Sequence, residues 1–200
     1  MLLTIGWGLI MVCGLAYLAR HSSLPGPTGL VSEKWPSESD LQGPNGPALL
    51  VFLHPKCGCS RSSLRELERL LAHSSIPDVR ILFYRPEDYD DDWCHTGLWE
   101  AAEGLQGVTT SIDRGGHEAR IFGVQSSGEA LLYDDQGRLQ FHGGLTAARA
   151  HEGPSIGTAA IEALLAGDIP QQRTSHVFGC SLSSNFSTRD STDRTTGQTP

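Results

Sequence analysis

The stretch at residues 48–73 constrains the fold of this 200-residue chain more than any other. It opens with an apolar run, residues 49–53, which is bounded by Pro47 and Pro55. A run this short between prolines favours a buried strand over a helix. Leucines then recur at helical spacing over residues 64–71, which predicts a helix. The stretch is therefore expected to form a strand, a turn and a helix.

The turn between this strand and helix carries two cysteines, Cys57 and Cys59, separated by Gly58. A cysteine at the start of a helix meets unpaired backbone N–H groups and the positive end of the helix dipole. Such surroundings stabilise the thiolate and lower the cysteine pKa, and Lys56 and Arg61 add positive charge nearby. The pattern indicates a C-x-C site for thiol–disulfide exchange.

The charge and cysteine content narrow the function classes. A net charge of −8 and a pI near 5.4 argue against nucleic-acid binding, which needs clustered Lys and Arg. Five cysteines are an odd number and do not form a closed disulfide framework. One close pair with scattered single thiols instead suits a redox or metal site.

The ends of the chain are expected to lie outside the domain at residues 47–170. Residues 1–19 have no charged side chain and approach the roughly 20 apolar residues that span a bilayer, which predicts a retained signal-anchor helix. A cleaved signal peptide is the alternative, although Ala-x-Ala does not end the run. Residues 20–46, rich in Ser, Pro and Gly, are expected to be a flexible linker. Residues 171–200 are predicted to be a mostly disordered tail, with a possible docking segment at residues 176–180.

Within the domain, periodicity predicts the remaining elements. Strands are expected at residues 79–84, 108–112, 129–133 and 139–142, and helices at residues 98–105, 117–122 and 155–166. Helices connect the early strands, and a hairpin closes the series. The expected fold class is α/β, a mixed sheet flanked by helices on both faces.

This arrangement, together with three segments of the chain, resembles the thioredoxin-like fold. The segments are FLHPKCGCSR, FGVQSSGEALLY and DDQGRLQFHGG. The form it is most similar to is the membrane-anchored TlpA/ResA-like thiol–disulfide oxidoreductase, of the RedB type. The resemblance implies Cys57 as the nucleophile and a substrate groove at Ser127 and Gly128. It also implies a single-pass protein of the cytoplasmic membrane whose domain faces the periplasm or another extracytoplasmic space, with disulfide-bearing or dithiol protein substrates and a redox partner.

Charge around the expected anchor bears on this orientation. Arg20 and Lys34 follow the apolar run, and nothing basic precedes it; this nominally argues against export. A start codon placed too far downstream would remove such preceding basic residues.

The sequence departs from the family pattern at two positions. The family's resolving cysteine is replaced by Ser60, and its cis-proline by Gly128. A proline there shapes the groove and keeps metals off the cysteines. Its loss makes a metal site more plausible.

Two thiols are candidates for resolving a mixed disulfide at Cys57. Cys59 would close a small, strained ring, whereas Cys180 would have to fold back from the apolar segment 176–180. Of the other cysteines, Cys94 is expected to be structural or unpaired, and Cys13 to lie in the membrane helix.

His54 lies three residues before Cys57 and is expected to assist the site, as are Lys56 and Ser60. The alternative function is copper binding or delivery on the same fold. Soft thiolates and imidazole select Cu(I), so Cys57, Cys59, His54 and His142 are the candidate ligands. In the oxidoreductase reading no cofactor is expected.

Overall fold

A computed structural model describes residues 2–182 of the chain. Strand β1 (Ala48–Leu53) is its central element, and all its residues are buried. This explains the continuous apolar run, because a strand covered on both faces has no polar side. Residues 183–200, most of the segment expected to be disordered, lie outside the described residues.

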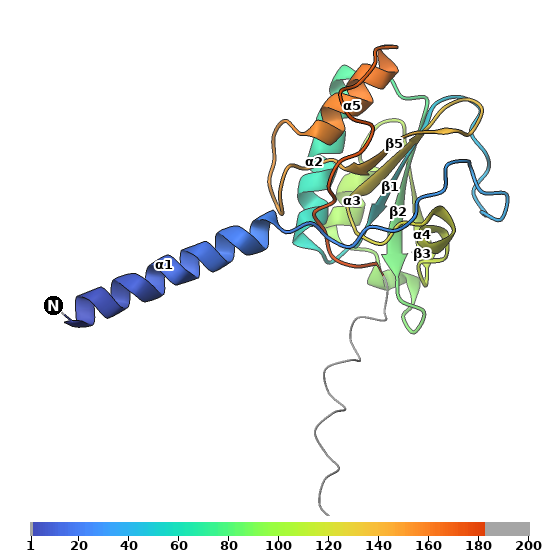
Figure 1. The fold of residues 1–200 in the computed structure, drawn as a ribbon. Coiled ribbons are helices and arrows are strands. Elements are labelled where there is room, and N and C mark those ends of the chain that lie inside the picture. Colours follow the sequence, from blue (N-terminus) through green and yellow to red (C-terminus); the bar gives the residue numbers. More distant parts are fainter. Residues whose placement is uncertain (1, 183–200) are drawn as a thin grey trace, which may run out of the picture.

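The sheet has the order β3-β2-β1-β4-β5. Strands β2 (Asp78–Arg85) and β3 (Val108–Arg114) continue it in parallel on one side of β1. Strands β4 (Glu129–Tyr133) and β5 (Leu139–Gly144) form the antiparallel hairpin on the other side. The mixed sheet flanked by helices is confirmed, and it is consistent with the thioredoxin-like α/β fold that the resemblance implies (Figure 1).

The helices are divided unequally between the two faces. Helices α2 (Gly58–His73), α3 (Gly97–Glu103) and α5 (Ile156–Leu165) supply side chains to the larger core cluster. Helix α4 (His117–Phe122), with only six residues, packs on the opposite face. That face includes Leu50, Phe52 and Tyr133, and it is too large for one short helix to cover.

The segment that precedes β1 supplies the missing cover. Ser32 N–H donates to the Phe122 carbonyl at 3.1 Å, and Leu139 N–H donates to the Glu33 carbonyl at 2.9 Å. The Trp35 ring meets the rings of Phe122 and Tyr133 at centroid distances of 5.2 and 5.3 Å. The structure therefore differs from the flexible linker expected at residues 20–46. The apolar face of the sheet holds this segment in place despite its Ser, Pro and Gly content.

A second segment, residues 173–182, crosses the domain near the other end of the chain, and we call it the C-terminal strap. It first runs beside β5, where His142 N–H donates to the Arg173 carbonyl at 3.1 Å. It then reaches residues 125–127, where Ser181 pairs with Ser126 in an antiparallel bridge. Residues 176–180, the possible docking segment, lie within this strap.

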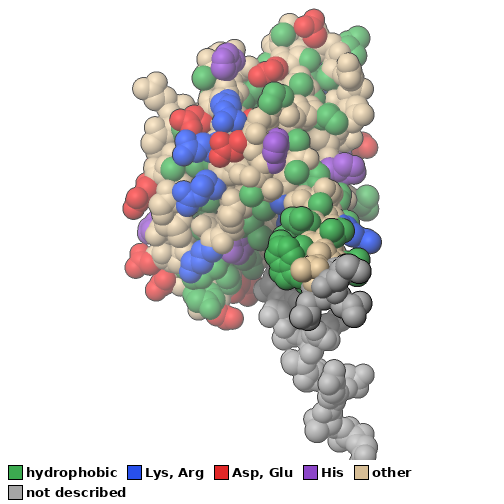
Figure 2. Space-filling model, turned by 90° about the vertical axis from the view of Figure 1, so that its left-hand side faces the viewer, with side chains coloured by type: hydrophobic (Ala, Val, Ile, Leu, Met, Phe, Trp, Pro, Cys, Tyr) green, Lys and Arg blue, Asp and Glu red, His purple; other side chains and the backbone are tan. Residues whose placement is uncertain are grey.

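The segment expected to be a membrane anchor is helix α1 (Leu2–Ser23), which projects away from the domain (Figure 1). Within residues 2–182, no helix combines the length and the apolar character that crossing a bilayer requires. The helix is confirmed, and the transmembrane anchor is not supported. Figure 2 views the molecule from the side toward which α1 projects. On this face of the domain, acidic, basic and histidine side chains are interspersed.

The packing of Trp35 yields a stability prediction. Trp35→Ala should lower the free energy of unfolding by about 2 kcal/mol, because a partly buried ring loses its contacts with Phe122 and Tyr133. Leu30→Ala is the matched control, since Leu30 is 98% exposed. Urea unfolding of both variants measures the difference. Equal stabilities would mean that the segment does not pack on the domain in solution.

Candidate thiol site

Cys57 occupies the boundary between the central strand and its helix. It is the N-cap residue of α2, with an extended backbone, and its N–H donates to the His54 carbonyl at 3.1 Å. Ser60 N–H donates back to the Cys57 carbonyl at 3.1 Å. Only 6% of Cys57 is exposed. The predicted strand–turn–helix therefore places this thiol at a helix start, as the sequence indicates.

The strap brings Cys180 directly onto Cys57. Their sulfur atoms are 2.8 Å apart, which is longer than an S–S bond of about 2.05 Å. All three thiols here are free: Cys57 is buried, Cys59 half-buried and Cys180 exposed. The structure thus joins Cys57 to the more distant of its two candidate partners, 123 residues away.

The surroundings favour charge on Cys57. Burial alone would raise its pKa, but hydrogen bonds from the Cys180 thiol and from backbone N–H groups outweigh burial and lower the pKa of Cys57. Burial raises the pKa of Cys59, and the nearby Cys57 charge raises it further. Partial burial and the contact with Cys57 raise the pKa of Cys180 to about 12. Cys57 is therefore the most acidic of the three thiols, and Cys180 can donate to it once Cys57 is deprotonated.

The loop between β5 and α5 adds two groups that the sequence analysis missed. The Ala150 N–H is hydrogen-bonded to Cys59 and offsets part of the rise in the Cys59 pKa. Ala150 has a φ of 52°, in the left-handed region. The Arg149 charge partly offsets the rise in the pKa of Cys59 and of Cys180. Its Nη1 donates to the Gly179 carbonyl at 3.1 Å. No local motif marks this loop, because its role depends on the folded position of the strap.

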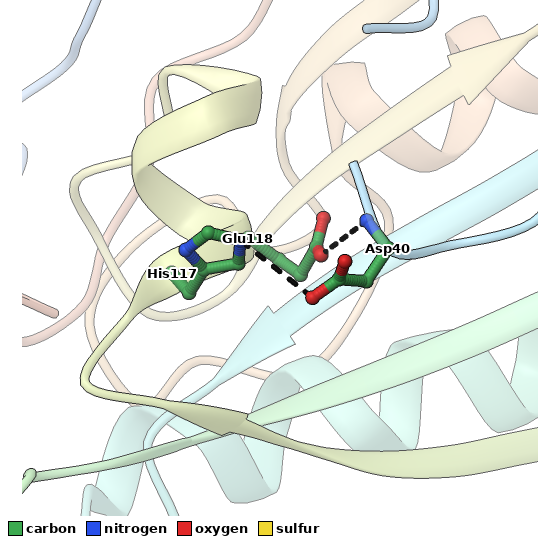
Figure 3. A group of neighbouring side chains, drawn as sticks. All are labelled: Asp40, His117 and Glu118. Carbon is green, nitrogen blue, oxygen red and sulfur yellow. Dashed lines mark hydrogen bonds and ion pairs between the residues drawn. The ribbon is translucent and has the colours of Figure 1, made fainter. Parts of the chain in front are cut away.

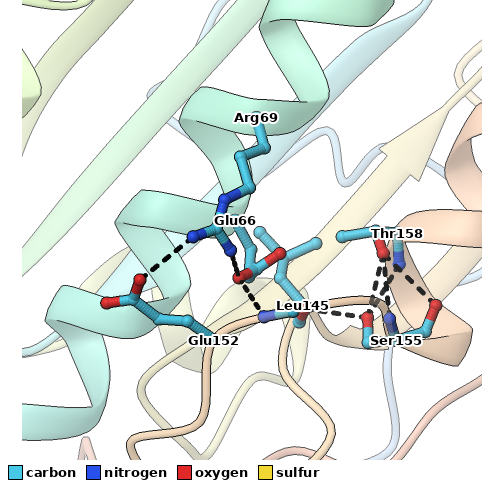
Figure 4. A network of polar contacts seen from close by, with 7 residues as sticks. Glu66, Arg69, Leu145, Glu152, Ser155 and Thr158 are labelled. Carbon is cyan, nitrogen blue, oxygen red and sulfur yellow. Dashed lines mark hydrogen bonds and ion pairs between the residues drawn. The ribbon is translucent and has the colours of Figure 1, made fainter.

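Glu66 on α2 anchors the same loop. Its carboxylate accepts the Gly153 N–H at 2.7 Å and pairs with Arg69, which also reaches Glu152 (Figure 4). Glu66 is 3% exposed, so this carboxylate ties the loop to the helix that carries Cys57. Beyond the anchor, Ser155 and Thr158 form the capping box of α5.

Ser60, at the family's resolving-cysteine position, has a structural role here. Its hydroxyl donates to the His54 carbonyl at 2.9 Å and lies 2.7 Å from the Ser127 hydroxyl. Because a serine has one hydroxyl hydrogen, Ser127 is the donor in the second bond. Ser127 Oγ in turn accepts the His54 N–H at 2.9 Å. The three residues form a closed, buried network below the cysteine turn.

The expected substrate groove is occupied by the strap. Ser127 N–H donates to the Cys180 carbonyl at 2.8 Å, and Leu182 N–H donates to the Gln125 carbonyl at 2.9 Å. Gly128 N–H donates to the Phe52 carbonyl at 2.7 Å. Ser127 thus binds the backbone of the cysteine-bearing strap, and Gly128 binds the backbone of β1.

His54 is turned toward the aromatic side of the turn. Its ring stacks on Tyr84 at a centroid distance of 5.8 Å, and its Nδ1 accepts the Lys56 N–H at 3.1 Å. Burial and the Lys56 charge lower the pKa of His54. The Lys56 ammonium lies 4.4 Å from the centre of the Trp93 ring. The described hydrogen bond of the His54 ring is therefore made with the Lys56 backbone N–H and not with a thiol.

His142 lies in another part of the sheet, beside Glu129. Its Nδ1 is 4.0 Å from the Glu129 carboxylate. Glu129 is fully buried, and neither carboxylate oxygen has a hydrogen-bond partner among the described residues. Burial raises the pKa of Glu129 to about 7. The Glu129 carboxyl therefore keeps its proton to a higher pH than an exposed glutamate does.

One group of potential metal ligands lies close together in the described part of the chain, and it is not the predicted copper set. It consists of Asp40, His117 and Glu118 (Figure 3). The Glu118 carboxylate already accepts the Ser39 hydroxyl at 2.6 Å and the Asp40 N–H at 3.0 Å. The group fastens the segment before β1 to α4.

The remaining cysteines are placed as expected for residues outside the site. Cys94 is fully buried, with its sulfur 3.6 Å from the Tyr84 carbonyl oxygen. Burial raises its pKa to about 11, so it is unreactive. Cys13 is exposed on α1.

Gly128 gives a test of why the family's proline is missing. Its φ is 88°, and a Cβ there would lie 2.7 Å from Ser63 Oγ. Proline requires a φ near −65° and has no N–H, so Gly128→Pro should lose the bond to Phe52 and destabilise the domain by about 3 kcal/mol or more. Gly97→Ala is the control, because nothing lies within 4 Å of its added Cβ. Thermal unfolding that leaves Gly128→Pro as stable as the control would contradict this account.

Comparison with known proteins bears on the fold. No protein-family profile matches the sequence, and neither does any curated protein. A hypothetical protein from Sinorhizobium meliloti is similar in structure, with 17% identity and a TM-score of 0.54 over 80% of this chain and 96% of that one. An uncharacterized conserved protein from Geobacillus kaustophilus gives 17% identity and a TM-score of 0.56 over 80% and 92%. A thioredoxin-like superfamily protein gives 16% identity and a TM-score of 0.41 over 74% and 99%. At 17% identity, the likeness to the first two structures concerns the fold alone.

Proposed function

We propose that this domain carries out thiol–disulfide exchange, with Cys57 as the attacking thiolate and Cys180 as the thiol that completes the reaction. The observation that carries the proposal is the 2.8 Å approach of the two sulfur atoms. The lowered pKa of Cys57 supports its role as nucleophile, because the thiolate and not the thiol attacks. The proposed partners are proteins that bear a disulfide or a dithiol, together with a redox partner that resets the site.

The exchange proceeds in two steps. The Cys57 thiolate attacks one sulfur of a partner disulfide, the partner's S–S bond breaks, and the other partner sulfur leaves as a thiolate. Cys180 then loses its proton and attacks Cys57 Sγ, which releases the second partner thiolate. A Cys57–Cys180 disulfide remains. Two electrons have passed to the partner, and two protons end on its thiols.

Cys59 is the rival for the second step. It would close a ring with only Gly58 between the two cysteines, and such a disulfide has distorted torsions. Burial and the Cys57 charge raise the pKa of Cys59, the contact of its side chain with Cys57 adds to the rise, and the Ala150 N–H and Arg149 only partly offset it. Ser60 is committed to the network with Ser127. Resolution therefore falls to Cys180 or Cys59, and the sulfur contact favours Cys180.

Disulfide mapping of the full chain tests these roles. After oxidation with a disulfide partner, digestion should yield a Cys57–Cys180 link. Cys180→Ala should accumulate mixed disulfides at Cys57, Cys57→Ser should abolish exchange, and Cys13→Ser is the control. Accumulation in Cys59→Ser, with none in Cys180→Ala, would transfer the resolving role to Cys59. Loss of all exchange together with one tightly held copper per chain would favour the copper-binding alternative.

Alkylation of Cys57 as a function of pH tests the hydrogen bond. Removing the Cys180 donor should raise the pKa of Cys57, so the midpoint should move to higher pH in Cys180→Ala. Cys180→Ser retains a hydroxyl donor, and its midpoint should move less. The midpoint is the informative quantity, since both variants also change access to Cys57. Identical midpoints in both variants and the parent chain would refute the assigned donor.

Attachment to a membrane through α1, with the domain on an extracytoplasmic or periplasmic side, belongs to the same proposal. It is supported by the exposed apolar side chains of α1, among them Trp7, Ile10 and Leu18. Covering such side chains with lipid or protein removes apolar surface from water, which is energetically favourable. Sedimentation with lipid vesicles measures membrane attachment. The full chain should pellet with the vesicles, and an Ile10→Asp/Leu18→Asp double variant should stay in the supernatant. Equal recovery in the supernatant for both chains would contradict membrane attachment.

A further inference from the structure

The strap is bound to the domain as a short additional strand. Ser127 N–H donates to the Cys180 carbonyl, Leu182 N–H donates to the Gln125 carbonyl, and Ser181 pairs antiparallel with Ser126. Backbone pairing of this kind is how an exposed strand edge receives an extended peptide. The backbone groups of residues 125–127 can therefore pair with an extended segment. In this structure the strap is that segment.

The approach of the strap is too close for any residue except glycine at one position. A Cβ added at Gly179 would lie 1.7 Å from the Ser127 carbonyl oxygen. That oxygen belongs to a fully buried residue whose side chain is fixed by His54 and Ser60, so it has little room to move. Arg149 also donates to the Gly179 carbonyl at 3.1 Å. An occupant that follows the backbone path of the strap and places a sulfur against Cys57 must accordingly have glycine directly before its cysteine.

The same strap blocks Cys57 from other occupants. Cys57 is 6% exposed, whereas Cys180 is exposed. Val177 and Phe178, at 0% and 8% exposed, fill the space before the glycine. Gly26 N–H donates to the Val177 carbonyl at 2.7 Å, which holds the strap from its outer side. A partner segment can reach Cys57 only after the strap has left.

We propose that partner proteins enter the groove at Ser127 with an extended segment that has glycine directly before the reacting cysteine. The strap is then a built-in competitor for the backbone groups of residues 125–127. The inference rests on the proposed function and specifies its substrates. The Cys57–Cys180 disulfide would lock the competitor in place. Reduction of that disulfide by a dithiol partner returns two thiols and permits the strap to leave.

Peptide labelling of the full chain tests the proposal. The background carries Cys59→Ser and Cys180→Ser, so that a mixed disulfide at Cys57 accumulates. The probe is a peptide with the sequence of residues 176–182, its cysteine activated as a thionitrobenzoate mixed disulfide. A matched peptide has alanine in place of the glycine, and a small aromatic disulfide serves as a third reagent. Gly179→Ala is compared with Gly43→Ala, where an added Cβ meets nothing within 4 Å.

Two results are expected. Gly179→Ala should displace the strap and increase the rate of Cys57 labelling by the glycine peptide about tenfold or more over Gly43→Ala. In the Gly179→Ala chain, the glycine peptide should label about tenfold faster than the alanine peptide. Mass spectrometry measures both rates. If Gly179→Ala does not unfold cooperatively, Arg149→Gln replaces it, because that change removes the side-chain bond to the Gly179 carbonyl.

The outcomes separate the two proposals. Equal labelling by the glycine and alanine peptides, in a chain whose Cys57 reacts with the small disulfide, would overturn the docking inference and leave thiol–disulfide exchange intact. Failure of Cys57 to react with any of the three reagents would overturn the proposed function itself. Unchanged labelling in Gly179→Ala and Arg149→Gln would show that the strap does not compete for the backbone groups of residues 125–127.

Discussion

The hydrogen bonds of Ser127 hold the thiol site together. Its hydroxyl joins the His54 N–H to the Ser60 hydroxyl, while its backbone N–H holds the Cys180 carbonyl. The residue is fully buried. Leaving any of these polar groups without a hydrogen-bond partner would therefore destabilise the folded state. One residue thus connects the end of β1, the start of α2 and the strap. The 2.8 Å sulfur contact depends on all three being fixed together.

The sequence was sufficient for the elements with strong local signals. The helix expected at residues 117–122 and the strand expected at residues 129–133 have the same bounds in the structure. Alternation, capping residues and turn residues act over a few positions, and a single sequence displays them directly. Cys57 at a helix start belongs to the same class, because a buried strand followed by leucines at helical spacing leaves the turn only one place.

Features that depend on distant contacts were harder to predict. The segment before β1 has a linker composition, yet it is held by the apolar face that α4 leaves uncovered, and Trp35 provides the contact. Arg149 and Ala150 carry no motif. They act on Cys59 from a loop that Glu66 helps to hold through the Gly153 N–H. The apolar island at residues 176–180 did indicate docking. Its site could not be read from the sequence, since pairing with residues 125–127 depends on backbone groups.

The choice between Cys59 and Cys180 has consequences for the direction of electron flow. A Cys57–Cys59 disulfide closes a strained ring, and strained disulfides have high reduction potentials and act as oxidants. A Cys57–Cys180 disulfide would close a loop across 123 residues, and a loop of about 100 residues restricts the unfolded chain by roughly 4.7 kcal/mol in the chain-entropy model. The folded chain already holds the two sulfurs together, so little further ordering is needed. A disulfide favoured in this way has a low potential. With Cys180 as the partner, the reduced domain would therefore serve as an electron donor to partner disulfides, whereas with Cys59 it would tend to oxidise them.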